Sequence, residues 1–202
     1  LLKSTLIAST LVLTALGAGT PAQADPGRFM VMQTATKAPV GYVQFCRENS
    51  RACPKESYEP VVVRLDEARW KELIAINAEV NRRIHPMTDT DLFGKEEYWT
   101  YPVNGYGDCE EYVLEKQRVL IEAGWPKSAL LITVAKDIQN SGHAVLTVRT
   151  DHGDMILDNQ VEAVLPWYST PYRYIKRQSA RSPVQWTGIS DTRVTTVSSV
   201  SN

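Results

Sequence analysis

The sequence has almost no net charge, few histidines and no hydrophobic run long enough to span a membrane. Its 202 residues carry 22 Lys and Arg against 23 Asp and Glu, a net charge of −1. Without an excess of basic residues, nothing in the composition indicates a nucleic-acid partner. Neither an internal repeat nor a low-complexity segment is present, so a single domain is predicted, with its core over residues 35–180.

The longest apolar run, "LIASTLVLTALGAG", lies close to the N-terminus and follows a lysine. It is shorter than the about 20 residues that a transmembrane helix needs. The "AQA" at residues 22–24 fits the small-x-small pattern of a signal-peptidase site. Residues 1–24 are therefore predicted to be a signal peptide, and an uncleaved N-terminal anchor is the alternative. Both predict export to a periplasm, and cleavage leaves residues 25–202 as a single domain without stable membrane insertion.

Cysteine is scarce, and its count of three is odd. Cys46 and Cys53 lie in "CRENSRAC" and would close a small loop, which is feasible in an oxidising compartment. Their pairing would leave Cys109 as the unpaired thiol, and an unpaired thiol in an exported protein calls for a reason such as catalysis. The alternative is that all three are reduced and buried as small apolar residues.

Two segments have the spacing of apolar residues that is typical of helices. The first follows Asp66, a suitable N-cap, and ends before Pro86. The second begins at Asp108 or Cys109 and runs to about Ala123, because glycine and proline follow it. The segment between these helices has no clear period and is predicted to be a long, ordered loop of the kind that tends to be functional.

The apolar pattern changes to a period of two after the second helix. Strands are predicted over residues 129–137, 142–150, 154–159 and 172–179. A hairpin turn is predicted at residues 151–153. Residues 25–60 show few clear elements, and whether the stretch after residue 179 adds a strand or remains a tail is open. Helices followed by antiparallel strands indicate an α+β fold.

Cys109 at the start of a helix has the chemistry of a nucleophile. Unpaired backbone N–H groups and the positive end of the helix dipole favour a thiolate there. His143 begins one predicted strand and Asp158 ends the next, so a hairpin would bring them together as a thiol triad with Cys109. The alternatives are a histidine bonded to backbone and an aspartate that terminates a strand. The other two histidines, His85 and His152, are less suited because they lie at a helix end and in a turn.

Three carboxylates surround the cysteine, namely Asp108, Glu110 and Glu111. Complementarity to the helix dipole explains part of this cluster. Carboxylates next to a thiol raise its pKa, however, which opposes thiolate formation. A calcium ion bound by Asp108, Glu110 and Glu111 would offset their charge.

An aromatic stretch, "EYWTYPVNGYG", directly precedes the nucleophile. Tyr98, Trp99 and Tyr101 are therefore candidates for the wall of a substrate cleft. Ordinary core packing is the alternative for all three.

The stretches "PMTDTDLFGKEEYWTYPVNGYGDCEEYVLEKQRVLIEAGWP" and "GHAVLTVRTDHGDMILDN" resemble the bacterial transglutaminase-like cysteine peptidases. This exported family includes the LapG-type periplasmic proteases, which cleave large surface adhesins. The resemblance extends over residues 40–178, and its anchors are Asp-Cys-Glu, a Gly-His strand start and an Asp-Asn strand end.

The resemblance implies a papain/transglutaminase-like core, in which N-terminal helices precede a helix that carries the cysteine and packs on an antiparallel sheet. It implies the triad Cys109, His143 and Asp158, with no cofactor needed for the chemistry. It also implies calcium (Ca2+) at Asp108 and Glu110, whose positions match the family's ligands, with Glu111 as a further candidate that matches less well.

The function predicted from these residues is a periplasmic cysteine peptidase that hydrolyses a peptide or isopeptide bond in a protein or peptide substrate. In the adhesin-cleaving branch that substrate is a surface adhesin, and a regulatory partner in the inner membrane is compatible with the same branch. One alternative is transglutaminase-type transfer of the acyl group to an amine. The other is a non-catalytic module on the same fold that binds a peptide or a cation.

Overall fold

The computed structural model describes residues 27–193. The predicted signal peptide, residues 1–24, lies outside the described residues, as do residues 194–202. Among the helices of the described part, none is both long and apolar enough to cross a membrane.

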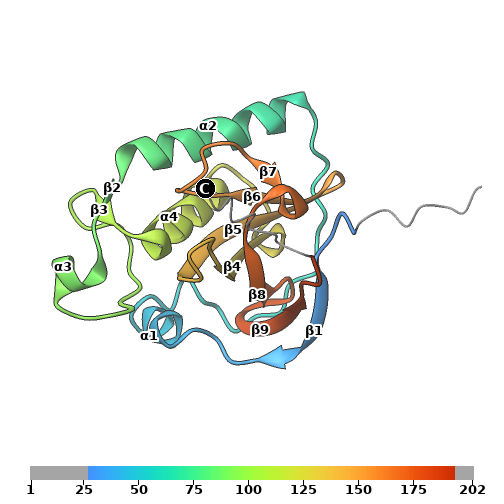
Figure 1. The fold of residues 1–202 in the computed structure, drawn as a ribbon. Helices are drawn as coiled ribbons and strands as arrows, with labels where there is room; N and C mark the ends of the chain where they lie inside the picture. Colours follow the sequence, from blue (N-terminus) through green and yellow to red (C-terminus); the bar gives the residue numbers. More distant parts are fainter. Residues whose placement is uncertain (1–26, 194–202) are drawn as a thin grey trace, which may run out of the picture.

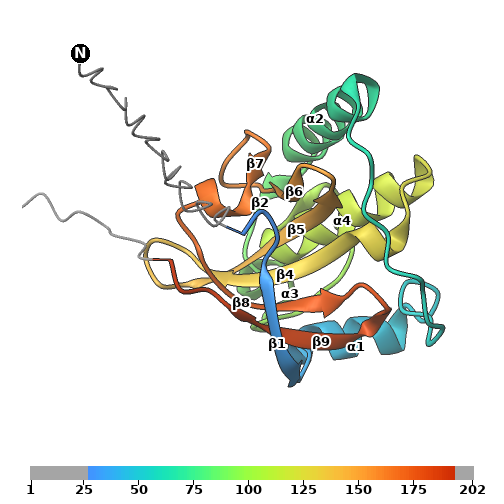
Figure 2. The same ribbon diagram turned by 90° about the vertical axis from the view of Figure 1, so that its right-hand side faces the viewer.

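A seven-stranded sheet forms the body of the fold, in the order β1-β9-β8-β4-β5-β6-β7, and every neighbouring pair in it is antiparallel. The strands are β1 (Val31–Thr36), β4 (Leu130–Lys136), β5 (Gly142–Thr150), β6 (Gly153–Leu157), β7 (Leu165–Pro166), β8 (Arg173–Ser179) and β9 (Ser182–Ser190). Figure 2 shows β1 lying along β9 at one edge of this sheet.

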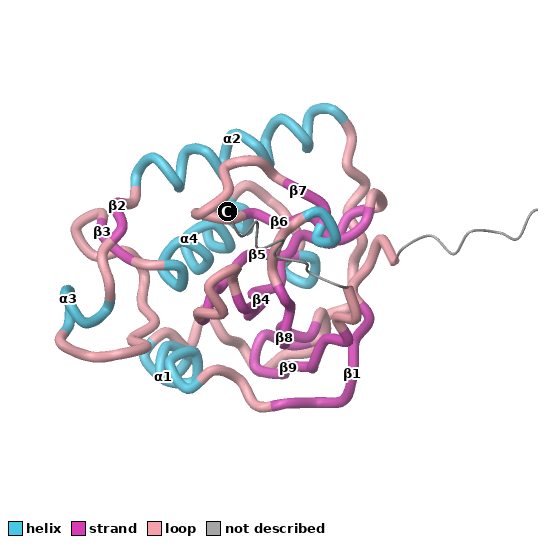
Figure 3. The backbone as a smooth tube through the Cα atoms, viewed as in Figure 1, coloured by secondary structure: helices cyan, strands magenta, loops and turns pink. Residues whose placement is uncertain are grey.

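The remaining elements are mostly helical, and most of them lie between β1 and β4 in the sequence. They are α1 (Val40–Glu48), α2 (Glu67–Arg83), α3 (Asp89–Phe93) and α4 (Cys109–Glu122), the 3-10 turns η1 (Lys127–Ala129) and η2 (Trp167–Ser169), and a short parallel pair of β2 (His85–Pro86) with β3 (Tyr106–Gly107). Figure 1 shows α4 against the sheet and α2 beside α4, and Figure 3 shows the main helices gathered beside the strands.

Both predicted long helices are present, with the predicted ends. The Asp66 side chain accepts a hydrogen bond of 2.9 Å from the backbone of Arg69, which caps the start of α2. Gly124 follows α4 with a φ of 86°, a left-handed conformation that glycine adopts without steric cost. The Trp125 N–H then bonds back to the Leu120 carbonyl and closes the end of the helix.

Alternate residues of the central strands belong to two apolar clusters, as the period of a strand requires. Ile132 and Leu146 lie in the main core together with buried residues of α1, α2 and α4. Val145 and Ile156 lie in a smaller second cluster. The predicted α+β order is therefore correct, since α4, the helix that carries Cys109, packs on an antiparallel sheet.

The prediction of few clear elements over residues 25–60 is wrong, because β1 and α1 lie there. Five of the six β1 residues are exposed, so this edge strand has no alternation of apolar and polar residues. In α1 the buried positions include a glycine, Gly41, which contributes no apolar side chain to a helical pattern. The stretch after residue 179 also adds a strand, β9, and the predicted long loop contains the short helix α3.

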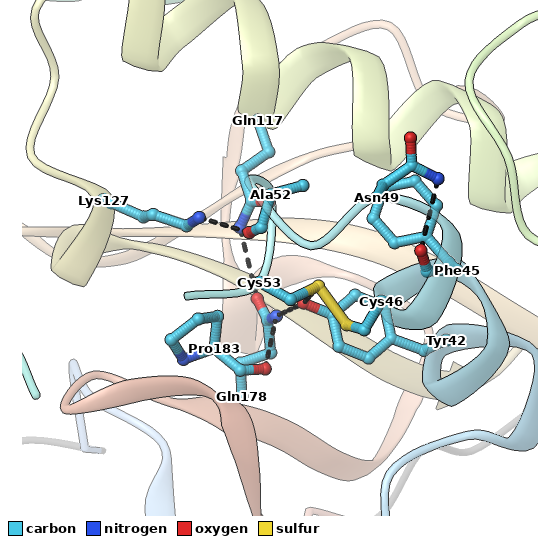
Figure 4. Close-up of a disulfide and its surroundings, with 10 residues drawn as sticks. All are labelled: Tyr42, Phe45, Cys46, Asn49, Ala52, Cys53, Gln117, Lys127, Gln178 and Pro183. Atoms are coloured by element: carbon cyan, nitrogen blue, oxygen red, sulfur yellow. Dashed lines mark hydrogen bonds between the residues drawn. A yellow bond between two sulfur atoms is a disulfide. The ribbon is translucent and has the colours of Figure 1, made fainter. Parts of the chain in front are cut away.

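A disulfide joins Cys46 in α1 to Cys53 (Figure 4). It lies beside a buried polar network, in which the Tyr42 hydroxyl is 3.3 Å from Cys53 Sγ and accepts a hydrogen bond of 2.7 Å from the Gln178 side chain. Gln178 in turn bonds to Gln117 of α4. The bridge therefore ties the end of α1 to the segment after it, and the network beside it connects α1 to the sheet and to α4.

Thiol titration of the denatured, unreduced protein should find one free thiol, that of Cys109. Replacing Cys46 and Cys53 together by alanine should lower the free energy of unfolding by about 2 kcal/mol, because the bridge restricts the unfolded chain. Urea unfolding measures this difference, and Cys109→Ala is the matched control that removes a cysteine without removing the bridge. Three titratable thiols would contradict the disulfide.

Candidate active site

Cys109 is the first residue of α4, and its position is fixed by a reciprocal cap. The Asp108 carboxylate accepts from the backbone of the first turn, and Glu111 Oε2 accepts a hydrogen bond of 2.8 Å from the Asp108 N–H. This capping box explains two of the three carboxylates around the cysteine. It also places Cys109, the free cysteine of the described chain, at the positive end of the helix dipole.

His143 and Asp158 form a buried pair at the end of the sheet where β5 begins and β6 ends. The two residues are 3% and 2% exposed. The His143 Nε2–H donates to Asp158 Oδ1 over 2.8 Å. This bond leaves Nδ1 as the nitrogen that could accept a proton from a thiol, and Nδ1 lies 3.4 Å from the Gln160 side-chain amide.

Cys109 lies beside β5, close to the residue that follows His143. Burial raises the pKa of this thiol, and the backbone N–H of Ala144, the residue after His143, opposes that effect in part. The thiol itself donates to Glu110 Oε2 over 2.9 Å. Among the hydrogen bonds of the described residues, none joins the thiol to His143. In this structure Glu110 is thus the acceptor for the thiol proton.

The surroundings of the thiol favour its protonated form. Burial, the Glu110 carboxylate and Asp108 together hold the pKa of Cys109 well above its ordinary value. The Glu110 and Asp108 carboxylates therefore oppose the activation that the helix dipole and the Ala144 N–H supply. An activated thiolate requires that this negative charge be offset.

The carboxylates form two groups that share Asp108. Within each group, one possible ligand atom from each residue lies within 4.8 Å of those from the other two. One contains Asp108, Cys109 and Glu110, and the other contains Asp89, Asp108 and Glu111. Asp89, from α3, was not identified from the sequence. It is 4% exposed, and its Oδ1 is buried with no hydrogen-bond partner among the described residues.

Burial and mutual repulsion disfavour the ionised form of the carboxylates in this cluster. Burial and the nearby Asp108 raise the pKa of Asp89 to about 6. Burial and Asp108 likewise raise the pKa values of Glu110 and Glu111. Buried carboxylates that share a site need protons or a cation, and oxygen donors are the ligands that calcium prefers. The unpartnered oxygen of Asp89 and the gathered carboxylates therefore fit a hard divalent cation.

The three aromatic residues proposed for a cleft wall lie in different surroundings. Trp99 is 2% exposed and packs in the main core against Tyr42, with ring centroids 5.6 Å apart, so core packing applies to it and the cleft role is wrong. Tyr101 is half-buried against Phe45. Tyr98 is half-buried, and its hydroxyl is 3.3 Å from a carboxylate oxygen of α1.

The other two histidines do not join the site. His85 lies in β2 with its ring near Tyr106, and His152 is exposed in the β5–β6 turn. Tyr172, by contrast, is predicted from the sequence only as part of a strand; it lies directly before β8, and its hydroxyl donates to Asp158. The sequence offers no local signal for this contact, because the two residues lie in separate segments.

The sequence of the chain matches a known family of cysteine proteinases. The profile of the bacterial transglutaminase-like cysteine proteinases matches residues 32–194. The chain belongs to that family. The predictions of a transglutaminase-like family and of a cysteine peptidase class are thereby confirmed at the level of the family. A search of curated proteins finds no match.

Solved structures of LapG from Legionella pneumophila have a similar fold. One LapG chain is 28% identical, with a TM-score of 0.48, over 55% of this chain and 64% of its own length. The calcium-bound form is 24% identical, with a TM-score of 0.51, over 62% of this chain and 73% of that one. The EGTA-treated form is 26% identical, with a TM-score of 0.50, over 61% and 72%. The chain thus spans less than two thirds of the first LapG chain, and the shared transglutaminase-like fold is confirmed.

Proposed function

We propose that this protein is a thiol peptidase that hydrolyses a peptide or isopeptide bond in a protein substrate through Cys109, His143 and Asp158. The observation that carries the proposal is the buried His143–Asp158 pair, in which Asp158 binds Nε2 and leaves Nδ1 available. The backbone of Ala144, the next residue of β5, acts on the pKa of the Cys109 thiol, so the thiol lies beside this pair. Membership of a cysteine proteinase family supports the same reaction class.

In the proposed reaction the thiol proton moves to His143 Nδ1, and the Cys109 sulfur attacks the carbonyl carbon of the scissile bond. Backbone N–H groups in the first turn of α4 stabilise the oxyanion. His143 then protonates the leaving nitrogen as the C–N bond breaks, which leaves a thioester on Cys109. A water molecule, deprotonated by His143, hydrolyses the thioester and restores the thiol. Asp158 holds the imidazole by its Nε2–H throughout.

We also propose that Asp89, Asp108, Glu110 and Glu111 hold a calcium ion. When bound, the ion would supply positive charge that offsets the carboxylates around Cys109. The unpartnered oxygen of Asp89 and the raised pKa values of the cluster support this assignment. LapG, a protein of similar fold, has a calcium-bound structure.

The proposed location is a periplasm. The pattern of residues 1–24 and the Cys46–Cys53 disulfide support export to an oxidising compartment. By analogy with the adhesin-cleaving branch of the family, the proposed substrate is a segment of a surface adhesin, and a regulatory protein of the inner membrane is the proposed partner.

The pH dependence of Cys109 alkylation by iodoacetamide tests the triad. With calcium present, the wild-type thiol should react with an apparent pKa below the ordinary thiol value of about 8.5. Without His143, burial and the carboxylates that raise the pKa of Cys109 above its ordinary value should dominate, so His143→Ala should slow alkylation at pH 7 by about 100-fold. Cys109→Ala shows which label belongs to this thiol, and His152→Ala, which removes an exposed histidine, should behave as the wild type.

An unshifted wild-type thiol, or equal rates in His143→Ala and the wild type, would contradict the proposed function. Mass spectrometry of the labelled protein, with Cys109→Ala as the blank, measures these rates without a known substrate.

A further inference from the structure

The carboxylate of Asp158 has a donor on each of its oxygens. Oδ1 accepts from His143 Nε2 over 2.8 Å and from the Gln160 backbone N–H over 3.1 Å. Oδ2 accepts from the Tyr172 hydroxyl. Because both oxygens are occupied, the carboxylate has a single orientation, in which Oδ1 faces the imidazole.

Tyr172 also contacts the imidazole itself. The rings of Tyr172 and His143 have centroids 5.0 Å apart and planes inclined by 60°. Tyr172 is 2% exposed, so this contact is buried. One side chain thus touches both members of the His143–Asp158 pair, the first with its ring and the second with its hydroxyl.

The backbone around Tyr172 is well anchored. Its carbonyl accepts a hydrogen bond of 2.6 Å from the Arg193 guanidinium. The Tyr174 ring packs edge-on, with its centroid 6.5 Å away, and the Tyr174 hydroxyl bonds to Thr170 over 2.8 Å instead of to Asp158. The Arg193 bond and the contact with the Tyr174 ring hold Tyr172 in place, and neither of them involves the Tyr174 hydroxyl.

We propose that Tyr172 is a positioning residue for the catalytic reaction, which holds the Asp158 carboxylate and the His143 ring in the orientation that proton transfer from Cys109 requires. The inference rests on the proposed function of the triad. Without the hydroxyl, Asp158 can rotate and the imidazole is less often aligned with the thiol. The sequence contains no motif around Tyr172 that assigns this role.

The charges around Asp158 determine how the pair responds to pH. Burial opposes ionisation of Asp158, but the bonds from His143, Tyr172 and Gln160 hold its pKa below the ordinary value. Lys116 of α4 adds positive charge toward Asp158, although burial lowers the pKa of this lysine to about 7. Removing the Tyr172 hydroxyl takes away a bond to the ionised form, so Asp158 should protonate at higher pH.

The test compares Tyr172→Phe with Tyr174→Phe in the full chain with calcium present. Both variants keep an aromatic ring in the same cluster and lose one hydroxyl. Tyr172→Phe should slow the alkylation of Cys109 at pH 7 by about tenfold and move the acid side of its pH profile to higher pH. Tyr174→Phe should leave both the rate and the profile unchanged, and thermal unfolding shows whether each variant is folded.

A double-mutant cycle separates positioning from a general loss of stability. If Tyr172 acts through Asp158, Tyr172→Phe should have less than a twofold effect in an Asp158→Asn background. An undiminished tenfold effect in that background would overturn the inference, as would a wild-type rate and profile in the single Tyr172→Phe variant. His143→Ala distinguishes failure of this inference from failure of the proposed triad. If His143→Ala slows alkylation and Tyr172→Phe does not, only the positioning role of Tyr172 fails. If His143→Ala reacts as the wild type, the proposed triad fails as well.

Discussion

Asp158→Asn should slow the alkylation of Cys109 at neutral pH by about 100-fold and leave the fold intact. The carboxylate accepts the His143 Nε2–H, and an amide can turn its NH2 toward that nitrogen instead. His143 would then carry its proton on Nδ1, where it could no longer accept one from the thiol. Iodoacetamide labelling followed by mass spectrometry measures the rate, and circular dichroism checks the fold.

The matched control is Glu162→Gln, which makes the same carboxylate-to-amide change at an exposed position on the loop after Asp158. This variant should label at the wild-type rate. If Asp158→Asn labels as fast as Glu162→Gln, Asp158 does not orient His143, and the assignment of the third triad member has to be abandoned.

Calcium should raise the thermal midpoint of unfolding by about 5 °C at pH 8 when its concentration is about 100 times its dissociation constant. The shift should be smaller at pH 5. The physical reason is that Asp89, Glu110 and Glu111 share a buried site and have pKa values above their ordinary ones. Differential scanning calorimetry with calcium and with a chelator measures both shifts.

The direction of the pH effect follows from proton binding. Between the ordinary Asp value of 3.8 and the value of about 6 for Asp89, the folded protein holds a proton that the unfolded chain has lost. The stability of the cation-free protein therefore falls as the pH rises through this window, and the two glutamates extend the fall up to their own raised pKa values. A bound cation replaces these protons, so its stabilising effect grows with pH.

Asp89→Asn should abolish most of this response to calcium and raise the stability of the cation-free protein at pH 8, because one buried charge is removed. Asp91→Asn is the control: it alters an exposed aspartate of the same helix, α3, whose carboxylate bonds to Thr88. The calcium shift should persist in this variant. An equal calcium response in both variants, or none in the wild type at pH 8, would refute the cation site.

Local signals in the sequence were sufficient for the elements that carry the triad. The apolar spacing and end signals of α2 and α4 act within a few residues, so they could be recognised without the fold. Alternating residues and a short turn likewise determined the β5–β6 hairpin, and antiparallel pairing then places His143 near Asp158. The position of Cys109 at a helix start, where a thiolate is favoured, indicated it as the candidate nucleophile. These predictions depend only on residues close together in the chain.

Tertiary structure alone decided the contacts between distant segments. Asp89 enters the carboxylate cluster because α3 lies beside the start of α4, and Tyr172 reaches Asp158 because its segment crosses the end of the sheet. Core packing of Trp99 depends on Tyr42 of α1, a helix whose own sequence pattern is weak. The free energy of such contacts comes from burial and hydrogen bonding across the whole fold, which no short window of sequence contains. The sequence thus determined which residues could react, and the tertiary structure decided which side chains hold them in place.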